Sequence, residues 1–193
     1  TSNIFGRVTG GNESRIFGTI DSATNFPTAN LWLLNPAGFF FGPTAALNVG
    51  GLVNISTADY LKMTDGTRFN ALPGPADALL SMAPVEAFGF LERQTLDPTF
   101  GRITVRSSDL RVKEGQTLSL IGKSLVIEGK EVILPDPNDE FGEATILNVS
   151  LSSPAGRLNL VAVGEVGEKQ GEVILGGTGS TSTVSMTGFP KLG

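Results

Sequence analysis

The sequence contains no cysteine and no histidine among its 193 residues. Without cysteine there is no disulfide framework, zinc knuckle, iron–sulfur cluster or thiol nucleophile. Without histidine, the Ser-His-Asp and Cys-His triads, the HExxH metalloprotease helix and haem ligation by histidine are excluded. We therefore expect neither a metal site nor a cofactor.

Charge is also scarce. Charged residues make up 17% of the chain, the formal net charge is −5 and the pI is near 4.8. A chain of this kind lacks the basic surface that attracts a phosphate backbone, so nucleic acid is not an expected partner. No apolar run approaches the roughly 18 residues of a membrane helix, so the chain is not expected to span a membrane.

Glycine is abundant, at 25 residues, and apolar residues recur at i, i+2 rather than with helical spacing. This pattern indicates strands of about three to five residues joined by turns. The clearest run consists of five successive apolar pairs: Ile103/Val105, Leu110/Val112, Leu118/Leu120, Leu125/Ile127 and Val132/Leu134.

Three steps along this run, from Ile103 to Leu125, make about 22 residues, which is a repeat typical of solenoids. Short strands at this period favour a parallel β-helix in which each coil gives one strand to each of three faces. The predicted fold class is therefore all-β, a right-handed single-stranded parallel β-helix with about 22 residues per coil. Glycine would occupy its corners and small polar residues its outer faces.

We expect one domain over residues 1–193. Its first part is 1–71, and a proline-rich excursion over 72–102 leaves the helix (extra-helical near 72–100), with a short helical turn around 76–80. Stacked coils over 103–193 follow, with a loop at 135–145 where two prolines and four carboxylates gather.

A turn motif marks the N-terminal part. Asn35-Pro36-Ala37-Gly38 joins the apolar runs Leu31–Leu34 and Phe39–Phe41, and Asn, Pro and Gly stand at the positions that a type I turn prefers. A β-helix corner explains this turn locally. The aromatic residues Trp32 and 39–41 are interpreted as core rather than as a sugar-binding platform.

Several segments together resemble the haemagglutination activity domain of filamentous-haemagglutinin-type exoproteins, the secretion domain of the two-partner secretion pathway. The turn and its surroundings match the family's Asn-Pro-Asn-Gly-Ile and the run that follows it. The matching segments are Asn35–Phe39, Phe41-Gly42, Ala46–Gly51 and Ser56–Asp59, with Ile4–Gly11, Ser14–Ile16 and Gly18–Ile20 before them and two later segments, Gly115–Gly122 and Ser153–Leu158, that resemble repeats following the domain.

The resemblance implies export and no enzymatic activity. The domain would cross the periplasm unfolded, meet the periplasmic domains of an outer-membrane transporter, and nucleate a β-helical adhesive stalk that is secreted or held at the cell surface. Asn35, Pro36 and Gly38 are the candidate residues, either for transporter recognition or for the turn itself. A host-cell or surface glycan is the implied adhesion receptor.

The sequence departs from the family at two positions, since Ala37 replaces the second Asn and Phe39 replaces Ile. The family's upstream portion is also missing, so we expect Thr1 to begin inside the domain and another segment or a partner to cover that end of the helix.

Two other interpretations stay open. A carbohydrate-active β-helix enzyme needs carboxylates that converge on one face, and clustering of Asp59, Asp65 and Asp77 in an open groove would favour it. A purely structural repeat segment would differ only in that nothing recognises the Asn35 turn.

Overall fold

The computed structural model describes residues 2–74, 77, 81–92, 97–136, 139–164, 170–176 and 183–188. These residues form strands and turns and include no helix. The expected helical turn around 76–80 falls outside them, apart from Asp77. Most strands belong to parallel sheets, as expected for an all-β protein of this type, and the arrangement is compatible with a β-helix.

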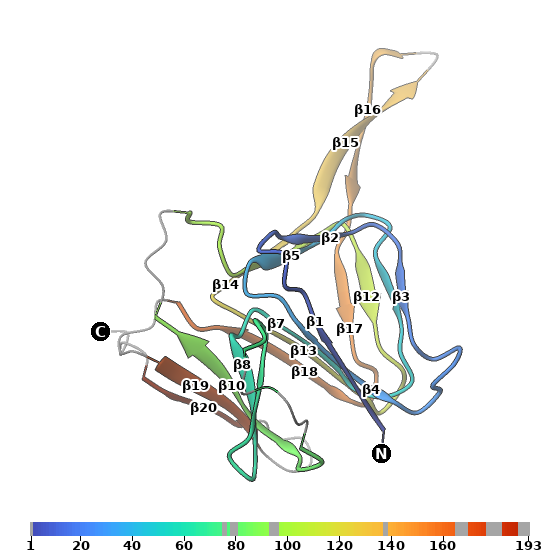
Figure 1. Cartoon of the computed structure of the whole chain (residues 1–193). Helices are drawn as coiled ribbons and strands as arrows, with labels where there is room; N and C mark the ends of the chain where they lie inside the picture. Colours follow the sequence, from blue (N-terminus) through green and yellow to red (C-terminus); the bar gives the residue numbers. More distant parts are fainter. Residues whose placement is uncertain are drawn as a thin grey trace.

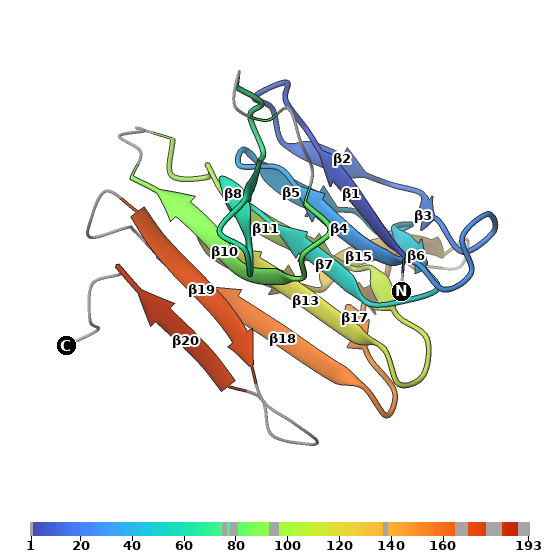
Figure 2. The same cartoon turned by 60° about the horizontal axis from the view of Figure 1, so that its bottom comes forward.

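The first parallel sheet has five strands, which Figure 2 shows side by side. In spatial order they are β1 (Asn3–Arg7), β4 (Asn30–Leu34), β7 (Val53–Ser56), β13 (Thr117–Gly122) and β18 (Arg157–Ala162).

The second parallel sheet and a third group of strands complete the enclosure (Figure 1). The second sheet contains β2 (Ser14–Ile16), β5 (Gly38–Phe41), β11 (Arg102–Arg106) and β14 (Ser124–Glu128). The third group contains two parallel pairs, β3 (Thr19–Asp21) with β6 (Ala46–Asn48) and β12 (Asp109–Arg111) with β17 (Ser150–Ser152). Strands β6 and β12 are neighbours but are not joined by a ladder.

The chain passes through the first sheet, the second sheet and the third group in that order, and then repeats. Leu31 pairs with Val53 and Ile103 pairs with Leu125, both at a spacing of 22 residues. Leu118 pairs with Leu158 at a spacing of 40, and the 18 residues from Lys130 to Leu147 that lie between them form a hairpin. The 22-residue repeat is therefore present wherever no insertion interrupts it.

That hairpin joins β15 (Lys130–Asp136) to β16 (Asp139–Leu147) in antiparallel pairing and projects away from the rest of the chain (Figure 1). The loop expected at 135–145 lies within it. Val132 and Leu134 were predicted to continue the stacked strands, and this was wrong because they pair across the hairpin. A hairpin has the same two-residue alternation as a stacked strand, so periodicity did not separate the two.

An antiparallel sheet forms the other insertion, in the order β20-β19-β10-β8-β9. The segment between β7 and β11 supplies three of its strands, β8 (Tyr60–Met63), β9 (Arg68–Asn70) and β10 (Val85–Leu91). Two strands come from the C-terminal part, β19 (Gln170–Gly176) and β20 (Thr183–Thr187). A final stacked strand was expected over 176–193, but β20 is antiparallel to β19, and residues 189–193 fall outside the described part.

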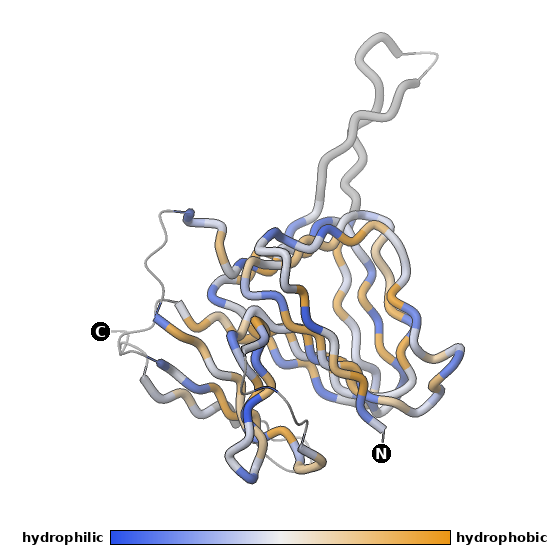
Figure 3. Tube along the Cα trace, in the orientation of Figure 1, coloured by the Kyte–Doolittle hydropathy of each residue, from blue (hydrophilic) through white to orange (hydrophobic). Residues whose placement is uncertain are grey.

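Two apolar cores result. One lies between the parallel stacks and includes Phe39, Phe41, Ile55, Ile103 and Leu120, all fully buried. Apolar residues recur along the strands that surround it (Figure 3). The second lies between the outer face of the first parallel sheet and the antiparallel sheet, where Leu34, Ile121 and Val161 pack with Leu61, Phe88, Phe90 and Val173.

Candidate functional site

The turn between β4 and β5 is built around Asn35, whose side chain is fully buried. Gly38 N–H donates to the Asn35 carbonyl oxygen (3.0 Å) and closes the turn. Ala37 N–H donates to Asn35 Oδ1 (3.0 Å), so the side chain holds the same turn from within. This is an Asx turn, in which an asparagine side chain replaces a backbone acceptor.

The amide nitrogen of Asn35 reaches back to the preceding corner. Nδ2 donates to the backbone oxygen of Asn12 and to the hydroxyl oxygen of Ser14, both at 2.9 Å. The backbone N–H of Asn35 donates to Ser56 O (3.0 Å), one circuit further along. Asn35 thus ties three successive corners together, and both of its side-chain N–H groups, its Oδ1 and both backbone groups are in use.

Pro36 and Gly38 fix the backbone of the same turn. Pro36 is buried, and a cavity of about 60 Å³ beside it is lined by residues that include Leu72 and Phe100. Gly38 has a φ of +128°, which side chains other than hydrogen rarely tolerate. A β-carbon on Gly38 would lie 2.7 Å from the backbone oxygen of Arg102 on the neighbouring strand β11.

Asn12 and Ser14 were not among the residues selected from the sequence. They precede Asn35 by 23 and 21 residues, close to the 22-residue repeat. The repeat therefore carried the signal, because it places these residues at the adjacent corner.

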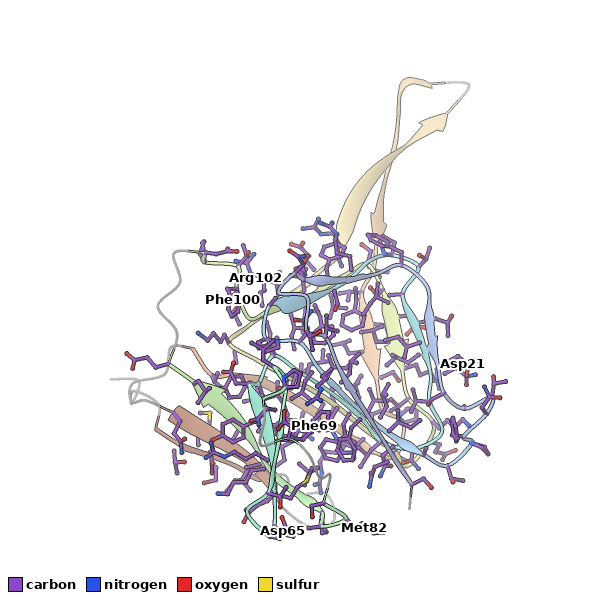
Figure 4. All side chains as sticks on the ribbon, viewed as in Figure 1. Asp21, Asp65, Phe69, Met82, Phe100 and Arg102 are labelled. Atoms are coloured by element: carbon purple, nitrogen blue, oxygen red, sulfur yellow. The ribbon has the colours of Figure 1, made fainter. Side chains whose placement is uncertain are left out.

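Asp59 and Asp65 have separate positions and partners. Asp59 is buried, and its carboxylate accepts the backbone N–H of Leu91 (2.7 Å). Asp65 is exposed and accepts the N–H of Thr67 (2.9 Å) and the hydroxyl of Ser81. Its pKa is held below the usual value chiefly by the Ser81 hydrogen bond. Figure 4 shows Asp65 beside Met82, far from Phe100 and Arg102.

Asp77 accepts hydrogen bonds from Asn70 Nδ2 (2.6 Å), Gly74 N–H (3.0 Å) and the Arg7 guanidinium (3.3 Å). Desolvation raises the pKa of this carboxyl, but the donors from Asn70 and Gly74 and the charge of Arg7 outweigh it, so the net pKa is lowered. Each of the three aspartates therefore has a structural role of its own. Within the described part of the chain, no cluster of three or more acidic residues could hold a metal ion.

A further polar cluster crosses the antiparallel sheet. The Tyr60 ring lies over Gly89 of β10, and its hydroxyl donates to Glu172 Oε1 on β19 (3.0 Å). Lys62 Nζ donates to the other oxygen of Glu172 (2.9 Å). Burial and the Glu172 hydrogen bond raise the pKa of Tyr60 to about 12. Burial also opposes ionisation of Glu172, but its Lys62 and Tyr60 partners lower its pKa overall. The cluster thereby joins segments that lie about 110 residues apart.

These features define an all-β domain whose conspicuous polar groups hold its own corners and insertions in place. A model of the TPS secretion domain family matches residues 1–189. The chain belongs to this family, which is a secreted exoprotein domain and not a known enzyme family. No match was found among curated proteins or among solved structures.

Membership implies export through the two-partner secretion pathway and interaction with the partner transporter. In the residues that the structure describes, no helix combines the length and apolarity needed to cross a bilayer.

Proposed function

We propose that this domain is the secretion module of an exported adhesin and that the transporter's periplasmic domains recognise the Asn35-Pro36-Ala37-Gly38 segment before the domain folds. The observation that carries the proposal is the family match over residues 1–189 together with the saturation of Asn35. Every donor and acceptor described for Asn35 is used within the domain. A partner that reads this side chain must therefore meet it in the unfolded chain.

After export, the domain folds as one unit over 1–193, into a right-handed parallel β-helix with three strands per coil. Support comes from the order in which the chain visits the stacks and from the 22-residue spacing. The two insertions, including the proline-rich segment, then pack outside the coils.

Strand β18 supports a role in nucleating an adhesive stalk outside the cell or on its surface. Leu158 and Leu160 continue the columns of Leu118 and Leu120, which are fully buried. Leu158 and Leu160 themselves are 40% and 43% exposed. One more strand stacked on β18 would cover them, as in a solenoid whose repeats bury one another's apolar faces.

An export assay tests the recognition step. In cells that make the full-length exoprotein and its transporter, we expect Asn35→Ala to reduce the secreted fraction at least several-fold, because the segment loses the side chain that the transporter reads. Secreted and retained protein would be quantified by immunoblot.

Ser108→Ala is the matched control. Ser108 is another buried corner residue, and its hydroxyl donates to the backbone oxygens of Phe41 and Gly42, so its loss weakens the fold without touching the segment. The variant should be exported normally. Equal export of Asn35→Ala and Ser108→Ala would leave Asn35 with a purely structural role.

A further inference from the structure

The outer face of the second parallel sheet carries an aromatic–arginine patch, which consists of Arg15, Phe17, Phe40 and Arg106. Phe39 and Phe41 point into the core and are fully buried, but alternation along β5 turns Phe40 outward, where it is only half-buried. Phe17, which follows β2, is 53% exposed. Two neighbouring rings on an outer face are not explained by core packing.

The patch is held in a fixed geometry. Arg15 lies directly across from Phe40 in the β2–β5 ladder, and its guanidinium carbon is 4.8 Å from the centre of the Phe40 ring. The Phe17 and Phe40 rings are tilted with their centres 5.8 Å apart. The Phe17 ring lies over Gly42, and its backbone oxygen accepts the Thr44 hydroxyl. The backbone and the neighbouring ring thus position Phe17.

The two arginines of the patch differ in charge balance. Arg106 lies 5.4 Å from the Phe40 ring centre, but its guanidinium is paired with Glu128. Arg15 is exposed, and no carboxylate among the described residues lies within ion-pair distance of it. The patch therefore presents one unpaired guanidinium beside an exposed ring.

We infer that this patch binds a glycan through a sugar residue that carries a carboxylate. The planar guanidinium of Arg15 matches a carboxylate through two parallel N–H donors, and contact with Phe40 holds that guanidinium in place. The apolar C–H face of the same sugar covers the Phe17 ring. One free cation and one exposed ring fit a single uronic-acid unit, whereas a polyanion would need a row of cations.

The inference rests on the adhesive part of the proposed function, for which it names the ligand class and the site. It is tested on the purified, folded domain, and no transporter is needed. Failure of glycan binding would leave the export step untouched, and failure of the export assay would leave the glycan site untouched.

Binding is measured by retention on immobilised polygalacturonate, with dextran as the neutral glycan and poly-glutamate as the acidic peptide. The wild-type domain should be retained on polygalacturonate alone. Arg15→Gln should weaken binding about tenfold, as expected for loss of a charge-assisted pair of hydrogen bonds. Phe17→Ala should weaken it several-fold.

Arg111→Gln is the control, because Arg111 is an exposed arginine on β12, in the third group of strands. It should bind like the wild type. Absence of binding to polygalacturonate, equal retention on poly-glutamate, or equal loss in the Arg15 and Arg111 variants would each overturn the inference. Urea unfolding of every variant, followed by the fluorescence of Trp32, the one tryptophan, establishes that each is folded.

Discussion

Replacing Gly38 by alanine should lower the free energy of unfolding by about 3–5 kcal/mol. Two effects add at this position. A φ of +128° is strained for any residue with a side chain, which costs about 1–3 kcal/mol. The new β-carbon would also lie 2.7 Å from the Arg102 backbone oxygen, and a backbone atom in a β-ladder cannot move aside without breaking pairing. Urea titration followed by Trp32 fluorescence measures the loss.

Gly115→Ala separates the two effects. Gly115 also has a positive φ, +75°, but a β-carbon there would meet nothing within 4 Å. This variant should lose only about 1 kcal/mol, the cost of the backbone conformation. If Gly38→Ala lost no more than Gly115→Ala, the close approach of the Asn35 turn to β11 would be disproved.

Replacing Phe90 by alanine should cost about 3–5 kcal/mol, as is usual for a large aromatic residue lost from a core. Phe90 is fully buried in the second core. The loss should appear in one cooperative transition, because the antiparallel sheet packs on the outer face of the first parallel sheet and the two share that core. Circular dichroism and Trp32 fluorescence should report the same midpoint.

Leu91→Ala is the neighbouring control. Leu91 is 37% exposed, so its truncation should cost below about 1 kcal/mol. A small effect of Phe90→Ala, comparable with that of Leu91→Ala, would mean that the antiparallel sheet is not packed on the parallel stacks.

The stacked part of the fold could be predicted because its signal is local. Apolar pairs seven or eight residues apart between residues 103 and 128 indicated the strands, and three steps gave the 22-residue repeat that the pairing of Ile103 with Leu125 shows. The Asn35 turn was equally local, since Asn, Pro and Gly each have a preferred place in it.

The insertions could not be predicted in the same way. The antiparallel sheet pairs β10 with β19, and the Lys62–Glu172 ion pair joins residues 110 positions apart. No local pattern specifies such a pairing, which is decided by apolar area that becomes available only when the first parallel sheet has formed. The proline-rich segment did indicate that the chain leaves the stacks, but not which strands it joins.

The candidate site shows the same division. Sequence selected Asn35, Pro36 and Gly38, and the structure adds Asn12 and Ser14 as their partners. For the aromatic run, Phe39 and Phe41 are core as predicted, whereas Phe40 faces outward beside Arg15. Alternation along a strand fixes which residues share a face, but not what stands across from them on the next strand.

The central claim is that the transporter recognises the Asn35 segment in the unfolded chain. The direct measurement is binding of the transporter's purified periplasmic domains to this domain across a urea series in which those periplasmic domains stay folded, with Trp32 fluorescence reporting the native fraction in each sample. Binding should increase as the native fraction falls, and it should begin at lower urea for Gly38→Ala. Binding that is strongest to the native domain and decreases as it unfolds would contradict the claim.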